Sequence, residues 1–292
     1  MIAPEIDSYL RNEKRTLDEV LLQAATGRVL HSIRRQFMEE KGDSKGVRLS
    51  MPLFCERQAA YKALGFPARH PEPRTVIKWL GGDLFEVAVL TVAQLAGCEL
   101  GVGQSEVFLD LGDGVRVKGH IDEMLRYKGS YYIVEVKSVT QQGLDDFQAD
   151  PVKWSDSWGY RAQANRYAFA AGTDGILFVV VCRDTGHIAE KVFPKDKDLL
   201  DRDIAAFRRI LKAQSPEEFP RAFEPEPEYT SVQGKDKIPD GVEAERRGSW
   251  YRWKTGRRVL GVRCSYCPFS QNACFQNVIV ETNGGKPVMV IA

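Results

Sequence analysis

Several features that define familiar protein classes are missing from this chain. No apolar run approaches the roughly 20 residues that a membrane-spanning helix requires, and the opening MIAPEIDSYLRNEKR lacks the apolar segment of a signal peptide. We therefore expect a cytoplasmic protein with no membrane partner. No internal repeat or long low-complexity tract is present, which argues against a repeat architecture.

The chain also has few histidines and a small net charge. The four histidines, His31, His70, His120 and His187, have no ligand-like spacing, so an enzyme built on histidine chemistry is disfavoured. The net charge of +1 says little about partners, because an average can hide a local field. The 292 residues, 43% hydrophobic and 28% charged, are typical of a soluble globular protein with a full core.

The order of expected elements describes an α/β fold. Periodicity and turn residues predict helices over 17–39, 56–65, 76–96, 158–171 and 196–213, and strands over 105–111, 115–123, 131–138 and 175–182. An irregular loop is expected between the third strand and the helix that follows it. The central order of helix, three strands, helix and strand predicts a mixed sheet with helices on both faces.

Three regions are expected along the chain. Residues 1–75 form a helical region and 76–213 form the core that holds the sheet. Prolines within 216–227 mark a linker at the start of region 214–292, which continues with a basic stretch and three clustered cysteines. We expect this third region to form one compact unit with the core.

The expected strand YYIVEVKS, Tyr131 to Ser138, contains two opposite charges. Residues two apart on a strand face the same side, so Glu135 and Lys137 point together while Val134 and Val136 line the other face. An ion pair at the sheet surface is the simplest interpretation of these two residues alone.

The preceding strand contributes a second carboxylate. Asp122, in VKGHIDEML, lies on a strand that a short turn joins to the strand of Glu135, so the two carboxylates can converge. Paired carboxylates suit a hard divalent cation such as magnesium or manganese, which could polarise a phosphate and lower the pKa of a bound water. Lys137 could hold or deprotonate that water and offset charge in the transition state. An ion pair alone would not explain Asp122.

Four of the six cysteines have metal-site spacing. Cys264, Cys267 and Cys274 lie in RCSYCPFSQNACF, and Cys55 is the distant thiol that could complete a set of four. The remaining two lie in apolar segments and are expected to be buried and inert. A cytosolic setting argues against disulfides, and the residues leave open an iron–sulfur cluster or zinc.

A basic stretch at 246–263 interleaves cations with aromatic rings. It holds seven basic residues, two tryptophans and a tyrosine, with no acidic residue. Such a mixture suits DNA, where cations meet phosphates and rings stack on unpaired bases; the alternative is a basic hairpin whose rings pack inward. The candidate DNA-binding residues are Arg246, Arg247, Trp250, Arg252, Trp253, Lys254, Arg257 and Arg258.

Asp122 followed by Glu135-Val136-Lys137 resembles the D…(D/E)xK signature of the PD-(D/E)XK nuclease superfamily. Ile121 stands where the motif has proline. The resemblance implies a restriction-endonuclease-like α/β core, with a mixed central sheet flanked by helices. It also implies that magnesium or manganese is bound by Asp122, Glu135 and the main-chain carbonyl of Val136.

Two further motifs resemble the RecB-type branch of this superfamily. Gln163 and Tyr167, spaced by four on one helix, resemble its Q-x-x-x-Y motif, although they could be ordinary helix residues. Gly82 and Glu86 resemble the glycine-then-acid motif that supplies another metal ligand; a solvent-facing Glu86 is the alternative. His120, beside the expected catalytic aspartate, is left open as a ligand.

Cys55 ahead of the core and the trio Cys264, Cys267 and Cys274 behind it resemble the iron–sulfur subset of this branch. That subset includes AddB-type nuclease domains and the small stand-alone nucleases of CRISPR adaptation. The resemblance implies a [4Fe–4S] cluster that staples a helical and C-terminal extension to the core. No G-x-x-x-x-G-K-[ST] sequence is present, so the helicase part of larger relatives is not expected.

The resemblance implies a metal-dependent DNA nuclease. We expect an exonuclease that acts at DNA ends in recombination, repair or CRISPR-type spacer processing, with a recombinase, annealing or helicase partner. In it Lys137 activates the attacking water, while Gln163 and Tyr167 position the strand. The alternative is an iron–sulfur or zinc DNA-binding module whose nuclease site is vestigial.

Overall fold

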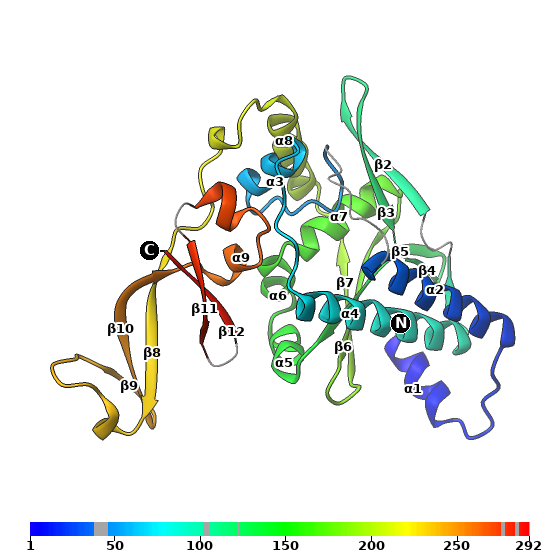
Figure 1. The fold of residues 1–292 in the computed structure, drawn as a ribbon. Helices are drawn as coiled ribbons and strands as arrows, with labels where there is room; N and C mark the ends of the chain where they lie inside the picture. The colour runs from blue at the N-terminus through cyan, green and yellow to red at the C-terminus, as the bar shows by residue number, and fades with distance from the viewer. Residues whose placement is uncertain (38–45, 102–104, 122, 276–277, 284–285, 292) are drawn as a thin grey trace.

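A mixed five-stranded sheet forms the centre of the fold. The computed structural model describes residues 1–37, 46–101, 105–121, 123–275, 278–283 and 286–291 (Figure 1). The sheet has the order β1-β4-β5-β6-β7, and only β5 and β6 run parallel. Its strands are β1 (Glu99–Leu100), β4 (Glu123–Tyr127), β5 (Ser130–Val139), β6 (Gly175–Cys182) and β7 (Ile188–Pro194). The mixed sheet expected from the sequence is confirmed, but its composition differs from the expectation. The expected strands 105–111 and 115–123 are not in it, because residues 105–112 and 115–121 pair with each other in a separate sheet, and β4 is the strand that pairs with β5.

Strand β6 lies in the interior of the protein. Every residue of GILFVVVC is buried, as expected of a strand that is covered on both faces. Its partner β5 places Ile133 in one hydrophobic cluster and Val134 and Val136 in another, so the two clusters lie on opposite faces of the sheet.

Helices cover both faces of the sheet (Figure 1). Helices α1 (Ala3–Arg11) and α4 (Pro73–Leu95) pack on the face of Val134 and Val136, and α2 (Glu19–Phe37) lies along α4. The cluster on the opposite face takes residues from α3 (Glu56–Ala63), α5 (Gln141–Ala149), α6 (Pro151–Ser157), α7 (Tyr160–Ala170) and α8 (Lys197–Lys212). None of the helices in the described ranges is long and apolar enough to span a bilayer.

Two smaller sheets complete the fold. Strands β2 (Ser105–Gly112) and β3 (Val115–Ile121) form an antiparallel hairpin. The C-terminal sheet has the order β11-β12-β10-β8, with β9 paired to β10, and its β8–β10 ribbon projects from the molecule (Figure 1). Its strands are β8 (Glu226–Gln233), β9 (Glu245–Arg247), β10 (Trp250–Val259), β11 (Val278–Asn283) and β12 (Lys286–Ile291).

Short helical turns connect these elements in the C-terminal region. They are η1 (Pro216–Glu218), η2 (Lys235–Lys237), α9 (Val262–Ser265) and the π-helical turn η3 (Ser270–Cys274).

The segment expected to be an irregular loop forms helices α5 and α6 instead. The Thr140 hydroxyl accepts from the Gly143 N–H at 3.3 Å and caps α5. The Asp150 carboxylate accepts from the Lys153 N–H at 3.0 Å, and Pro151 occupies the first position of α6. Both caps satisfy main-chain donors that a helix start leaves open, so the sequence contained signals for these helices.

Candidate active site

Strand β5 presents Glu135 and Lys137 on the sheet face that α7 covers. In the register with β6, Glu135 lies opposite Phe178 and Lys137 opposite Val180, both in the cluster that includes α7 residues. The Lys137 ammonium forms an ion pair with the Glu135 carboxylate. Glu135 is only 6% exposed, whereas 28% of the Lys137 side chain remains accessible. The pair is therefore largely desolvated but reachable from solvent through the lysine.

The charge state of Lys137 follows from its neighbours. Burial alone would lower the pKa of the Lys137 ammonium, but the charge of Glu135 and its hydrogen bond outweigh burial, so that pKa is raised. The ammonium lies 4.9 Å from the centroid of the Tyr160 ring, at the start of α7. Lys137 is consequently a cation at neutral pH, suited to stabilising negative charge.

Helix α4 passes the C-terminal end of β5. A Cβ added at Gly82 would lie 3.9 Å from the Ser138 hydroxyl, so α4 runs close to the strand there. Glu86, one turn further on and half-buried, is among the carboxylates that raise the pKa of Lys137. Glu86 therefore lies within electrostatic reach of Lys137.

Helix α7 brings the predicted Gln163 and Tyr167 to the same side of the sheet. Tyr167 is buried, and a Cβ added at Gly119 of β3 would lie 2.6 Å from its ring. Only glycine fits at position 119 without displacing that ring. Gln163, one turn earlier on the helix, is half-buried. The helix thus runs from Tyr160 beside Lys137 to Tyr167 against β3.

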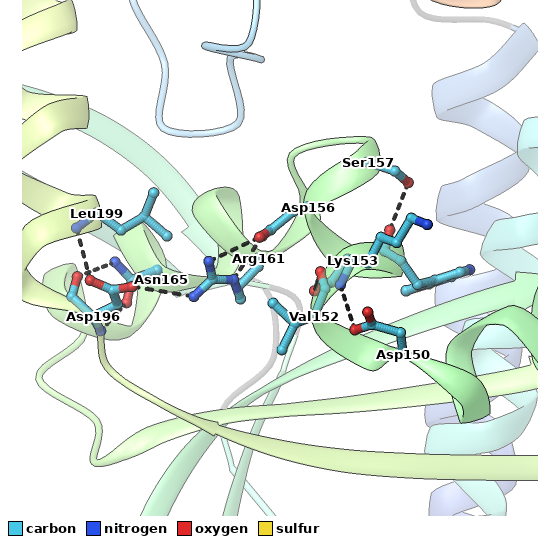
Figure 2. Close-up of polar contacts among 11 residues, drawn as sticks. Asp150, Val152, Lys153, Asp156, Ser157, Arg161, Asn165, Asp196 and Leu199 are labelled. Atoms are coloured by element: carbon cyan, nitrogen blue, oxygen red, sulfur yellow. Dashed lines mark hydrogen bonds and ion pairs between the residues drawn. The ribbon is translucent and has the colours of Figure 1, made fainter.

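A polar network fixes the orientation of α7 (Figure 2). The Arg161 guanidinium bridges Asp156, at 2.7 Å, and Asp196, at 3.2 Å, and so ties α7 to α6 and to the start of α8. Asn165 donates to the Asp196 carbonyl at 2.8 Å and accepts from the Asp196 N–H at 2.9 Å. Asp196 also caps α8 through the Leu199 N–H, at 2.9 Å.

A buried ion pair adds to this network. Arg166 is almost fully buried, ion-pairs with Asp203 of α8 at 2.6 Å, and donates to the Leu49 and Met51 carbonyls. Arg166 of α7 therefore holds α8 and the segment around Leu49 and Met51 against its own helix.

Asp122 lies outside the described residues, but its neighbours are placed. Strand β3 ends at Ile121, and β4 begins at Glu123, which pairs with Val134 of β5. His120 lies opposite Glu106 in the β2–β3 hairpin, with Nε2 3.7 Å from the carboxylate and half of its side chain exposed.

Glu123 is a buried acid that the sequence reasoning overlooked. It is fully buried, and its Oε2 lies 3.3 Å from Nη2 of Arg28 on α2. The sequence indicates this burial, because Glu123 alternates with Ile121 and Leu125 and so occupies a position where an apolar, core-facing residue is expected. This ion pair connects α2 to the first residue of β4.

The four cysteines predicted to act together line one pocket. Cys55, Cys264, Cys267 and Cys274 share it with the rings of Phe54, Tyr61, Phe223 and Phe275 and with Arg221 and Arg263. Burial raises the pKa of the Cys264 thiol to about 11 and that of Cys267 to about 12, and the neighbouring cysteines contribute to both shifts. Cys182 is buried as expected, Cys98 is half-buried, and all six cysteines are free thiols.

The cysteine pocket is not a ready-made site for a single ion. Within the part of the chain that the structure describes, no group of three or more histidine, cysteine or acidic side chains is close enough to hold one metal ion. The four thiols line the same pocket but are not arranged as a site for one ion.

The cysteine pocket also contacts the corner between α6 and α7. The Arg263 guanidinium donates to the Ser157 carbonyl, and the Tyr266 and Trp158 rings lie 6.4 Å apart, edge to face. A Cβ added at Gly159 would lie 3.3 Å from the Phe54 ring. Because α7 starts directly after this corner, the corner joins the cysteine pocket to the helix that faces Lys137.

The predicted DNA-binding residues fall on β9 and β10 and differ in their surroundings. Arg257 is neutralised by Glu228, at 2.8 Å, and Glu281, at 2.7 Å. Arg247 pairs with Glu245 at 3.2 Å. By contrast, Arg246, Trp250, Lys254 and Arg258 are exposed, and Arg252 and Trp253 are half-buried. Arg257 is therefore a poor candidate for binding phosphate.

The mixed sheet, with helices on both faces, thus carries an acid–lysine pair on its central strand beneath a covering helix. The family model described as PD-(D/E)XK nuclease superfamily matches residues 8–274. The chain belongs to the PD-(D/E)XK nuclease superfamily, and that membership implies a nuclease.

Comparison with other proteins adds little to this assignment. A search of curated proteins finds no match. A crystal structure described as that of SSO0001 is 13% identical, over 66% of this chain and 89% of the other, with a TM-score of 0.41. This likeness is too distant to carry an argument.

Proposed function

We propose that the chain is a magnesium- or manganese-dependent deoxyribonuclease that hydrolyses phosphodiester bonds at DNA ends. The observation that carries the proposal is the largely desolvated Glu135–Lys137 pair on β5, facing α7. Buried charges are costly to retain, and a cation beside a carboxylate at an accessible sheet surface suits a reaction in which a phosphate gains negative charge.

The metal would be held by oxygen ligands. Glu135, the main-chain carbonyl of Val136 and Glu86 offer the hard donors that magnesium and manganese prefer, and Asp122 is the fourth predicted ligand. When bound, the ion would polarise the phosphate and lower the pKa of a coordinated water.

Lys137 lies beside the proposed metal ligand Glu135. Its amine would orient or activate the attacking water and stabilise the phosphate oxygens. Water attacks phosphorus and loses a proton to solvent, the bond from phosphorus to the leaving oxygen breaks, and that oxygen takes up a proton from solvent. Lys137 offsets the developing charge. Gln163 and Tyr167 position the strand along α7.

For the cysteine pocket we propose a [4Fe–4S] cluster bound by Cys55, Cys264, Cys267 and Cys274. Support comes from the four thiols lining one pocket, in whose wall the described part of the chain places no acidic or histidine side chain. Four cysteine thiolates are the ligand set that a [4Fe–4S] cluster requires. Such a cross-link would close a long chain loop and stabilise the fold.

The cluster proposal has its own test. Iron, sulfide and zinc are measured in anaerobically purified protein and in Cys264→Ala. We expect four irons per chain in the wild type and a colourless, less stable variant with weak nuclease activity. One zinc and no iron, or a stable and fully active variant, would contradict the cluster.

The nuclease proposal is tested with end-labelled single-stranded and duplex oligonucleotides in magnesium, manganese or chelator. Cleavage should require the metal, disappear in Lys137→Ala and survive in the matched control Lys153→Ala, whose lysine is exposed on α6. The product ladder then gives polarity and separates end trimming from internal cleavage. Tight DNA binding without cleavage under any metal would instead favour the binding module with a vestigial site.

The resemblance to the RecB-type branch supports a place in recombination, repair or CRISPR-type spacer processing. A recombinase, annealing or helicase protein would then be the expected partner. Co-purification with such a partner from the native host tests this assignment.

A further inference from the structure

One face of the β8–β10 ribbon gathers aromatic and basic side chains. In the antiparallel register, Trp250 lies opposite Gln233, Arg252 opposite Ser231 and Lys254 opposite Tyr229. Directly paired residues share a face, as do residues two apart on one strand. Tyr229, Trp250, Arg252 and Lys254 therefore lie on a common surface, which we call the arm face.

The rings of the arm face are open to solvent. Trp250 is 49% exposed and Tyr229 is 39% exposed, although large aromatic residues are normally covered. The Arg252 guanidinium lies 3.8 Å from the centroid of the Tyr229 ring, in the diagonal cross-strand position. Tyr251 and Trp253, on the opposite face of β10, are half-buried instead.

Glu245 of β9 lies opposite Arg252 but forms its ion pair with Arg247 instead. Among the ion pairs between described residues, none involves Arg252 or Lys254, whereas Arg257 on the same strand is neutralised by Glu228 and Glu281. The positive charge on this face is thus available to an anion.

Partly exposed rings that alternate with cations not neutralised by an acidic side chain match one kind of ligand. Unpaired bases stack on exposed rings of a sheet, while cations bind the phosphates between them; in a duplex the same bases are already stacked and covered. Successive positions on one strand face lie roughly 7 Å apart, so neighbouring bases and phosphates can be contacted in turn. A protein partner would not require free cations between the rings.

We propose that the arm face binds single-stranded nucleic acid, with bases stacked on Trp250 and Tyr229 and phosphates on Arg252 and Lys254. This inference rests on the proposed nuclease function and names its substrate class. The projection of the ribbon from the molecule (Figure 1) leaves this surface free for an extended strand.

Binding is measured on the full-length chain in chelator, by fluorescence anisotropy of a labelled single-stranded oligonucleotide and of the matching duplex. Stacking on one ring corresponds to roughly tenfold in affinity, so Trp250→Ala and Tyr229→Ala should each weaken single-strand binding by about that factor. Duplex binding should change much less. Wild-type single-strand affinity in both variants, or equal losses on the duplex, would overturn the proposal.

Arginine variants provide a matched pair. Arg252→Ala should weaken single-strand binding and flatten its salt dependence, because one phosphate contact is lost. Arg202 is exposed on α8 and lies outside the ribbon, so Arg202→Ala removes the same charge elsewhere and should have a much smaller effect. Equal effects of the two variants would mean that net charge, and not the arm face, governs binding.

Tryptophan fluorescence reports stacking directly. A single strand should quench wild-type fluorescence, and Trp250→Phe should lose part of that quenching while it still binds, since phenylalanine can stack. Because these measurements need no cleavage, they separate the two proposals. Cleavage by Lys137→Ala would contradict only the proposed nuclease site. Wild-type single-strand binding by the arm-face variants would contradict only the proposed arm-face site.

Discussion

Charged residues occupy two very different settings in this molecule. Around α7 they are buried and paired, as in Glu135–Lys137 and Arg166–Asp203. On the C-terminal ribbon they are mostly exposed, and some, such as Arg252, contact an aromatic ring instead of an acid. Removing a charge from water is costly, whereas an exposed charge contributes little to stability. The first group should therefore control folding and cleavage, and the second should control binding.

The largest stability effect is expected at Arg166. Arg166→Met would leave the Asp203 carboxylate buried without its partner and the Leu49 and Met51 carbonyls without a donor. Breaking such a buried pair from one side destabilises a protein by about 3–5 kcal/mol. Denaturant unfolding measures this change. A loss below about 1 kcal/mol would mean that burial does not determine how much a charged side chain contributes to the free energy of unfolding.

A smaller effect is expected where α7 meets β3. Gly119→Ala would place a Cβ 2.6 Å from the Tyr167 ring and 2.8 Å from Leu49, so the side chains must move. Overpacking of this kind destabilises by about 1–3 kcal/mol, and the displaced Tyr167 should also lower the cleavage rate.

Gly81 provides the control for that substitution. It lies inside α4, and an added Cβ would meet nothing within 4 Å. Gly81→Ala should stabilise the protein by about 0.5–1 kcal/mol, opposite in sign to Gly119→Ala. Thermal unfolding of the two variants side by side distinguishes the crowded site from the open one.

The ribbon should respond to acid. Hydrogen bonds from Arg257 and then Thr255 hold the pKa of the buried Glu228 carboxyl below its usual value of 4.5. A lowered pKa stabilises the folded state above that usual value, and this stabilisation is lost as the pH falls through the folded-state pKa. Unfolding measured below pH 4.5 should therefore show a steeper loss in the wild type than in Glu228→Gln. Identical pH profiles would rule out this contribution.

The smallest effect is expected at Arg247. Its ion pair with Glu245 is more than half exposed on both sides, and such pairs are worth about 0.2–1 kcal/mol at most. Arg247→Ala should unfold nearly as the wild type does, in contrast to Arg166→Met. A loss as large as that of Arg166→Met would remove the distinction between the two settings.

Local patterns predicted the central part of the fold well. Alternation in YYIVEVKS placed Glu135 and Lys137 on one face, and the apolar run GILFVVVC predicted a covered strand. Both features depend only on neighbouring residues, and the structure shows the expected strands.

Partnerships between distant segments could not be predicted in the same way. The pair of Arg28 and Glu123 depends on how α2 lies over the sheet. The neutralisation of Arg257 by Glu281 depends on which strands become neighbours in the C-terminal sheet. Arg166 looks like a surface residue in the sequence and is buried only because α8 packs behind α7.

The most direct test of the central claim compares cleavage and stability in one variant, Lys137→Met. The variant is first shown to be folded by circular dichroism, and its metal-dependent single-turnover cleavage is then measured beside its free energy of unfolding. If the lysine stabilises the transition state, cleavage should fall by roughly 10²–10³ while the fold persists. A folded Lys137→Met protein that cleaves at the wild-type rate would reduce Glu135–Lys137 to a structural ion pair and contradict the catalytic assignment.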